Sequence, residues 1–243
     1  MLEHSTICLT GLPGSGKHRL QKAILKQFAM DFSQVQVGSE LSTSMAFQQV
    51  WCVIDIRSTL QGLADERIEH DLIALLKKAD RVIFNFAEAA ELEVQSYWSK
   101  WVRQQSQAIE IVRVLNQRLP EQALECLSTN ISRPANVQKH DFICETLETY
   151  HFEVNTIHLE HLLMGLDSSK QNLGMQIWRV QAVVQTFEYE NLVAIEGTPY
   201  RWDTYAAERD EAFEAKSGWI KIQGFQLQQA WLSEIIQASS CRT

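Results

Sequence analysis

Residues 11–18, Gly-Leu-Pro-Gly-Ser-Gly-Lys-His, have the residue types and the spacing of a loop that binds phosphate. Gly11, Gly14 and Gly16 can take backbone angles that other residues resist, so successive N–H groups can curve around an anion. Lys17 adds a cation for the outer phosphates. The pattern G-x-x-x-x-G-K therefore predicts a P-loop. Its candidate nucleotide-binding residues are Gly11, Pro13, Gly14, Ser15, Gly16, Lys17 and His18.

The position after the lysine departs from this pattern. A P-loop continues with Ser or Thr, whose hydroxyl holds Mg²⁺, whereas this chain has His18. Imidazole is a poor ligand for a hard cation that prefers oxygen. Asp55, near the end of an apolar run, is a candidate for holding Mg²⁺ through water or for orienting Lys17, and equally for capping the turn at Ser58. We expect phosphate binding, with little support for Mg²⁺.

The elements around the loop alternate in a way that predicts an α/β fold. A short apolar strand precedes the loop over residues 6–10, and an amphipathic helix follows it over residues 19–29. Further strands are predicted over residues 50–56, 81–85 and 109–114, with at most a short one at 35–37. Helices are predicted over 87–104 and 120–127, and residues 60–78 form either one helix or two short ones. Such alternation favours a mostly parallel, P-loop NTPase-type sheet flanked by helices, with the nucleotide at the carboxyl ends of the strands.

The second part of the chain has a different pattern. Residues 128–139 are rich in turn-forming types and predict a linker between a P-loop domain over 1–127 and a second domain over 140–243. A helix is predicted over 157–166, capped by Asn155 or Thr156. The other predicted elements are strands over 151–156, 176–185, 192–196 and 219–222 and a closing helix over 226–238. This order predicts a small α+β domain with an antiparallel sheet.

Composition excludes several classes of protein. With 243 residues and a formal net charge of −8, the chain has no basic stripe of the kind that binds nucleic acid or an anionic membrane. We find no signal peptide or membrane span near the N-terminus, so a cytoplasmic location is expected. The five cysteines are odd in number and scattered, which favours reduced core thiols over a disulfide framework or a metal site.

Four segments resemble the CobW-like P-loop GTPases, a family of metal-trafficking and metal-insertase proteins. Leu9–Lys17 is like the family's Thr-Gly-Phe-Leu-Gly-(Ala/Ser)-Gly-Lys start, and Val53–Ile56 is like its Val-Val-Asp-Ala strand. Ala79–Asn85 resembles its Ala-Asp-x-(Ile/Val)-(Val/Leu)-Leu-Asn-Lys-x-Asp segment. Ile177–Val183 is similar to a strand of its C-terminal domain. The resemblance implies bound GTP or GDP and a role in metal homeostasis, with a client metalloprotein or another protein as partner.

The departures from the family point to lost catalysis. The family's Cys-x-Cys-Cys metal motif and Glu-x-x-Gly switch are missing between Lys17 and Val50. The guanine-reading Asn-Lys-x-Asp has become Asn85-Phe-Ala-Glu88, where Glu88 reaches too far and Phe86 could stack on a base without completing the set. We interpret the chain as a degenerate, pseudo-GTPase-like relative with weak or absent hydrolysis. The alternatives are a non-enzymatic interaction module with a relic P-loop, or an active GTP or ATP hydrolase or P-loop kinase.

Three other groups of residues have two interpretations each. His158 and His161, with His151 and His140 upstream, are either metal ligands or polar residues of a helix face. Most of the tryptophans form either the core or a binding surface, namely Trp98, Trp101, Trp178, Trp202, Trp219 and Trp231. The acidic run at residues 208–214 is either a solvated segment or a docking site.

Overall fold

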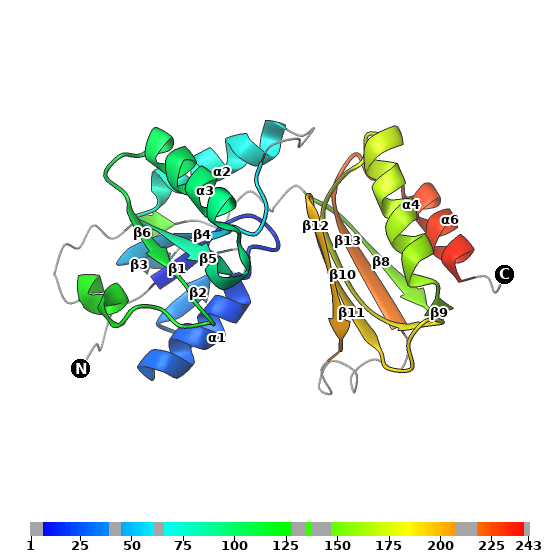
Figure 1. The fold of residues 1–243 in the computed structure, drawn as a ribbon, viewed down its shortest axis with the longest axis horizontal. Helices are drawn as coiled ribbons and strands as arrows, with labels where there is room; N and C mark the ends of the chain where they lie inside the picture. Colours follow the sequence, from blue (N-terminus) through cyan, green and yellow to red (C-terminus); the bar gives the residue numbers. More distant parts are fainter. Residues whose placement is uncertain are drawn as a thin grey trace. The chain divides into compact units, whose positions relative to one another are not determined.

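The computed structural model describes residues 7–38, 45–60, 66–127, 135–137, 147–207 and 218–240. The chain divides into two compact units, unit 1 over residues 1–145 and unit 2 over residues 146–243 (Figure 1). Each unit has its own sheet and its own helices. None of the helices in the described ranges combines the length and the apolar character that a membrane crossing needs.

The main sheet of unit 1 is parallel throughout and has five strands in the order β2-β1-β4-β5-β6. These strands are β1 (Ile7–Thr10), β2 (Val35–Val37), β4 (Gln49–Asp55), β5 (Arg81–Asn85) and β6 (Glu110–Arg113). β1, β4 and β5 are buried along nearly their whole length. The sequences of these strands are nearly continuous apolar runs, because helices cover both faces of a parallel sheet. The strands predicted from these runs are confirmed.

The helices of unit 1 lie on both faces of its sheet. They are α1 (Lys17–Phe28), α2 (Glu66–Lys78) and α3 (Leu92–Gln105), with 3₁₀ turns η2 (Ala87–Ala89) and η3 (Glu121–Leu127). The chain steps from β1 to β2 in one direction, and from β4 through β5 to β6 in the other. Right-handed crossovers therefore place α1 on one face and α2 and α3 on the opposite face, as Figure 1 shows. Leu20 and Ile24 of α1 pack on apolar side chains of β1, β4 and β5.

A two-stranded ribbon was not predicted. β3 (Met45–Phe47) pairs antiparallel with β7 (Ala135–Val137). β7 lies in the segment that the sequence indicates as a linker, and the rest of that segment, residues 128–134 and 138–139, is outside the described residues. Met45–Phe47 does not alternate apolar and polar residues, and Ala135–Val137 lies in a segment rich in turn-forming types, so neither was predicted as a strand. Residues 135–137 therefore form a strand that pairs inside unit 1.

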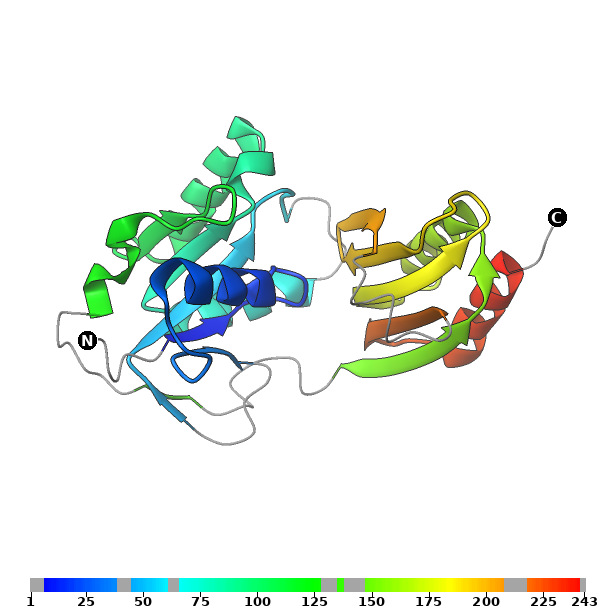
Figure 2. The ribbon, with the colours of Figure 1, turned by 90° about the horizontal axis from the view of Figure 1, so that it is seen from below.

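Unit 2 has an antiparallel sheet in the order β12-β11-β10-β13-β8, and β9 adds a short parallel pairing with β10. The strands are β8 (Glu148–Val154), β9 (Thr156–Ile157), β10 (Gln176–Thr186), β11 (Val193–Thr198), β12 (Arg201–Ala206) and β13 (Gly218–Phe225). α4 (Leu159–Asn172) and α6 (Gln229–Ser239) lie on one face of the sheet (Figures 1 and 2) and share one apolar core with it. Together with the parallel sheet of unit 1, this confirms the predicted fold class.

Several elements begin or end at other residues than predicted, and one strand was not predicted. The N-cap position of α4 is His158 rather than Asn155 or Thr156, because residues 156–157 pair with β10, and the His158 side chain makes no capping hydrogen bond. α3 starts at residue 92 rather than at 87, because Phe86 has a φ of 60° and Ala90 is extended, which separates η2 from the helix. β12 was missed because its side chains are half-buried or exposed, so it lacks an apolar run.

Candidate functional site

The candidate loop lies where the direction of strand order reverses in the sheet of unit 1. β1 sits between β2 and β4, so the segments that follow β1 and β4 leave the sheet toward opposite faces. Ligands of open α/β sheets bind at such a point, outside the carboxyl ends of the strands. Three segments meet at this edge: the P-loop (residues 11–16) after β1, residues 56–58 after β4 and residues 86–90 after β5. Asp55 and Asn85 are register partners at the ends of their strands.

The P-loop has a backbone that requires glycine at three positions. Gly11, Gly14 and Gly16 have φ angles of 142°, 83° and 80°, in a region that residues with a Cβ rarely adopt. The loop also runs close to β4, because a Cβ on Gly11 would lie 2.3 Å from the carbonyl oxygen of Val53. Ser15 N–H donates to Leu12 O at 3.2 Å and closes the turn. These three predicted residues therefore shape a compact loop that leads into the first turn of α1.

Lys17 is held underneath this loop. It is the first residue of α1, and the residue is 7% exposed. Its Nζ donates to the carbonyl oxygens of Gly11 at 2.9 Å and Leu12 at 2.8 Å and lies 3.5 Å from Ser15 Oγ. These acceptors are neutral, so they fix the ammonium without cancelling its charge. The helix N-terminus adds a partial positive charge at the same place, and together they favour an anion such as phosphate.

Asn85, predicted to contact a base, fastens the P-loop to β5. Its side chain is buried, its Nδ2 donates to Ser15 O at 3.0 Å, and its Oδ1 accepts from Phe86 N–H at 3.1 Å. Glu88, its predicted partner in base reading, is exposed on η2. A base contact by these two residues stays a prediction. Asn85 also has a positioning role that the sequence did not reveal.

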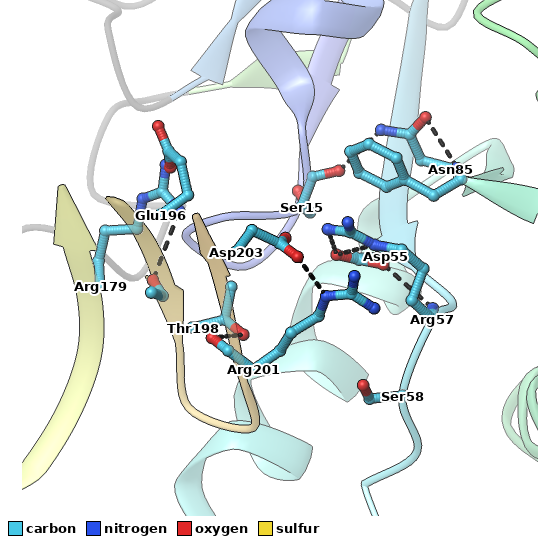
Figure 3. Close-up of polar contacts among 12 residues, drawn as sticks. Ser15, Asp55, Arg57, Ser58, Asn85, Arg179, Glu196, Thr198, Arg201 and Asp203 are labelled. Carbon is cyan, nitrogen blue, oxygen red and sulfur yellow. Dashed lines mark hydrogen bonds and ion pairs between the residues drawn. The ribbon is translucent and has the colours of Figure 1, made fainter. Parts of the chain in front are cut away.

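Asp55 is paired with Arg57. Oδ1 of Asp55 accepts from the Arg57 backbone N–H at 3.0 Å and from Arg57 Nε at 2.9 Å. Oδ2 accepts from Nη2 at 2.6 Å and from Nε at 3.2 Å. The side chains are 0% and 11% exposed. The carboxylate thus caps the following turn at Arg57 rather than at Ser58 (Figure 3). Sequence reasoning missed Arg57, although Asp-x-Arg directly after a buried strand was a usable signal.

Phe86 brings a second arginine to this edge. The Arg57 guanidinium carbon lies 3.9 Å from the centroid of the Phe86 ring, and that of Arg19 in α1 lies 4.8 Å from it, both within cation–π range. The ring also touches the P-loop, because a Cβ on Gly16 would lie 2.9 Å from Phe86 Cε2. With 9% of the residue exposed, Phe86 serves as a support for the two arginines. This arrangement disfavours the predicted stacking of a base on it.

The segment that carries Arg57 is tied down on both sides. Ile56 N–H donates to Asn85 O at 3.3 Å, which continues the pairing of β4 with β5. Trp98 Nε1 of α3 donates to Ser58 O at 2.9 Å. Arg57 therefore lies between two anchored residues, and its guanidinium is held by the carboxylate and the ring described above. Such pre-organisation means that little side-chain entropy is lost when an anion binds beside it.

Mg²⁺ does not fit this set of side chains. The position of the expected hydroxyl ligand is taken by His18, which is exposed. Both oxygens of Asp55 accept two hydrogen bonds each from Arg57. Thr10 has a buried hydroxyl without a hydrogen-bond partner among the described residues, but one neutral oxygen does not make a site for an ion that needs six oxygen ligands in octahedral geometry.

Unit 2 carries polar contacts of its own on three neighbouring strands. Arg179 of β10 forms an ion pair with Glu196 of β11. On β12, Arg201 Nε donates to Asp203 Oδ1 at 2.6 Å, and Thr198 Oγ1 of β11 donates to Arg201 O at 3.2 Å (Figure 3). Burial lowers the pKa of Arg179 to about 10, while the nearby Tyr205 and Asp203 act in the opposite direction. The Arg179 guanidinium is therefore still charged at neutral pH, and its ion pair with Glu196 links β10 to β11.

The other candidate groups are only partly brought together. Trp98, Trp101 and Trp178 are buried, which confirms the core interpretation for these three, whereas Trp219 and Trp231 are partly exposed. The rings of His158 and His161 lie 5.0 Å apart. Among the described residues no three His, Cys, Asp or Glu side chains are grouped as metal ligands would be. His140 and the acidic run at 208–214 lie outside the described residues.

Two cysteines lie in the buried strands next to the P-loop. Cys8 of β1 and Cys52 of β4 are free thiols, in agreement with the predicted reduced core cysteines. Burial raises the pKa of both thiols to about 12, and the charge of Lys17 lowers that of Cys52 slightly. A thiol with so high a pKa is a poor nucleophile at neutral pH, so neither residue is a candidate for covalent catalysis.

No family model and no curated protein matches the sequence. Among solved structures, the zinc-bound YjiA GTPase from E. coli aligns at 10% identity over 98% of this chain and 99% of its own, with a TM-score of 0.34. A zinc-bound triple mutant of YjiA GTPase aligns at 10% identity over 90% of this chain and 74% of its own, with a TM-score of 0.33. Because such low TM-scores support no functional inference, we base the function on the geometry of the P-loop itself.

Proposed function

We propose that the P-loop of unit 1 binds the phosphate groups of a nucleotide, and that the chain hydrolyses that nucleotide weakly or not at all. The observation that carries the proposal is the position of Lys17. Its ammonium is fixed by the carbonyl oxygens of Gly11 and Leu12, at 2.9 and 2.8 Å, beneath a glycine-rich turn at a helix N-terminus. On the resemblance, the nucleotide is GTP or GDP. The nucleotide-binding domain is proposed to span residues 1–127 and the second domain residues 140–243.

The Asp55–Arg57 pair supports the proposal that hydrolysis is weak or absent. Phosphoryl transfer is accelerated almost entirely by positioning and by stabilising charge, with Mg²⁺ as a principal contributor. Here the carboxylate that would help to hold the ion is bound to a guanidinium, and the hydroxyl position is His18. The same observation supports the alternative of a non-enzymatic interaction module, in which nucleotide occupancy regulates contact with a partner protein.

Nucleotide titration of matched lysine variants tests the proposal. Lys17→Ala removes the fixed ammonium, whereas Lys22→Ala removes an exposed lysine of the same helix. A charged hydrogen bond contributes about 1.5–3 kcal/mol, so we expect Lys17→Ala to weaken GTP and GDP binding by about 10- to 150-fold. The Lys22→Ala variant should bind like the wild type. Equal binding by both variants, or no binding by the wild type, would refute the proposal.

We also propose a role in metal homeostasis, supported by the resemblance of the four segments named in the sequence analysis. In this role the chain would pass a metal ion, as cargo, to or from a client metalloprotein. Metal analysis of the protein purified from zinc-supplemented cells, with and without bound nucleotide, tests it. A zinc content that changes with nucleotide occupancy is the expected result, and a content indistinguishable from zero in both states would contradict it.

A further inference from the structure

The rim of the P-loop carries three cations within one packed group. Lys17 lies beneath the loop, and Arg19 and Arg57 both contact the Phe86 ring, which itself touches Gly16. Arg19 belongs to the first turn of α1, and Arg57 follows β4. The two arginines therefore come from different elements and are brought to the same edge of the sheet by one aromatic side chain.

The charges in this group match those of a metal-loaded site. A magnesium ion beside one carboxylate gives a net charge of +1, and the charges of Arg19, Arg57 and Asp55 give the same sum. Guanidinium groups stay charged at every relevant pH and bind phosphate with fork geometry. Asp55 and Phe86 hold Arg57 in place before any ligand binds, much as protein ligands hold an ion.

We propose that Arg57, assisted by Arg19, takes the electrostatic place of the divalent cation, so that this site binds nucleotide phosphates without Mg²⁺. The inference rests on the proposed function, since it concerns the same P-loop. It extends the proposed function by naming the form of the ligand that binds, a metal-free di- or triphosphate. It also explains why His18 is tolerated where a magnesium-binding hydroxyl is otherwise needed.

Binding measured with and without Mg²⁺ tests the assignment. The probes are GDP and inorganic triphosphate, titrated calorimetrically in excess MgCl₂ and in excess EDTA. The wild type should bind each probe with affinities that agree within about threefold between the two media. Arg57→Gln should weaken binding in EDTA by about tenfold or more, because a charge-assisted contact is lost. Mg²⁺ should then partly restore the affinity of this variant, because its Asp55 oxygens are released.

Two further variants control for charge and for folding. Lys77→Gln removes one positive charge from the exposed last turn of α2, which leads into the amino end of β5 at the opposite edge of the sheet. It should bind like the wild type in both media. Arg19→Gln changes an exposed side chain of α1, so it keeps the inference testable if Arg57→Gln fails to fold. It should weaken binding in EDTA by about threefold.

The outcomes separate the two proposals. Wild-type binding that requires Mg²⁺ would overturn the inference and leave the P-loop function standing. Wild-type binding that ignores Mg²⁺, with Arg57→Gln and Arg19→Gln both behaving like Lys77→Gln, would overturn the assignment to these arginines. If the wild type binds the probes in neither medium, the proposed function and the inference are both refuted. The inference is supported if the wild type binds equally well in both media and only the Arg57→Gln and Arg19→Gln variants lose affinity in EDTA.

Discussion

Gly16 of the P-loop packs against the side chains of Asn85 and Phe86, so its replacement by alanine tests how the site is packed. Its φ is 80°, and an added Cβ would lie 2.4 Å from Asn85 Nδ2 and 2.9 Å from Phe86 Cε2. Real Cβ atoms do not approach so closely, so Asn85 and Phe86 must both move. We expect Gly16→Ala to destabilise unit 1 and to weaken phosphate binding at the loop.

The magnitude follows from three contributions. A left-handed backbone costs alanine about 1–2 kcal/mol. Displacing Asn85 breaks its hydrogen bond to Ser15 O, now 3.0 Å long, which costs about 1 kcal/mol. Forcing the Phe86 ring aside is overpacking and costs about 1–3 kcal/mol. We therefore expect the free energy of unfolding of unit 1 to fall by about 3–6 kcal/mol, a large part of the stability of a domain of this size.

Gly174→Ala is the matched control. Gly174 in unit 2 has a similar φ of 65°, but a Cβ there meets nothing within 4 Å. Only the backbone cost applies, so its own unit should lose about 1–2 kcal/mol. The difference between the two variants therefore measures the contacts of Gly16 with Asn85 and Phe86.

Native-state hydrogen exchange followed by mass spectrometry reads the two units separately. Peptides from β1 and β4 report unit 1, and peptides from β10 and β13 report unit 2. The reasoning would be refuted if Gly16→Ala lowered protection in unit 1 by no more than Gly174→Ala lowers it in unit 2. It would also be refuted if Gly16→Ala left the affinity for GDP unchanged.

The remaining predictions concern the buried thiols and the helix contact of unit 2. Folding raises the pKa of Cys8 and Cys52 from 9.0 to about 12, so the folded state binds more protons above pH 9. The two thiols make their full contribution to the stability of unit 1 below pH 9. Between pH 9 and 12 the free energy of unfolding of unit 1 should fall by about 1.4 kcal/mol per pH unit for each thiol. A Cys8→Ala/Cys52→Ala variant whose stability falls equally steeply over this range would contradict the prediction. In α4, a Cβ on Gly165 would lie 2.6 Å from Ile235 Cγ2, so Gly165→Ala should destabilise unit 2 by about 1–2 kcal/mol, because overpacking outweighs the gain in helix propensity. In an Ile235→Ala background the clash is removed, so Gly165→Ala should stabilise unit 2 by up to about 1 kcal/mol through its higher helix propensity. Urea unfolding of the wild type, the two single variants and the double variant, analysed as a double-mutant cycle, checks this reversal of sign.

The pairing of Asp55 with Arg57 changes how the site is understood. From the sequence, Asp55 was a candidate for Mg²⁺, for orienting Lys17 or for capping a turn. In the structure it caps a turn and also binds the guanidinium of the residue it caps. A carboxylate with an arginine so close in sequence has a partner that competes with any metal ion. The motif alone therefore does not indicate a cation site.

Much of the P-loop could be predicted because its determinants are local. The apolar run of β1, the three glycines and the amphipathic pattern of α1 lie within residues 7–28, and each constrains its own backbone. The buried strands β4 and β5 were predicted for the same reason. The ribbon of β3 and β7 was not, because its two strands lie far apart in the chain and, among the described residues, each pairs only with the other.

The sequence by itself determined a strand, a glycine-rich turn and a helix with a lysine at its start, since the backbone preferences of those residues act over a few positions. Only the tertiary structure decided what surrounds that turn. Asn85 reaches Ser15 O across 70 positions of the chain, and Phe86 meets Arg19 from another element. These contacts depend on which strands become neighbours in the sheet, because the carboxyl ends of neighbouring parallel strands share one edge. That order is a property of the whole core, and no single segment encodes it.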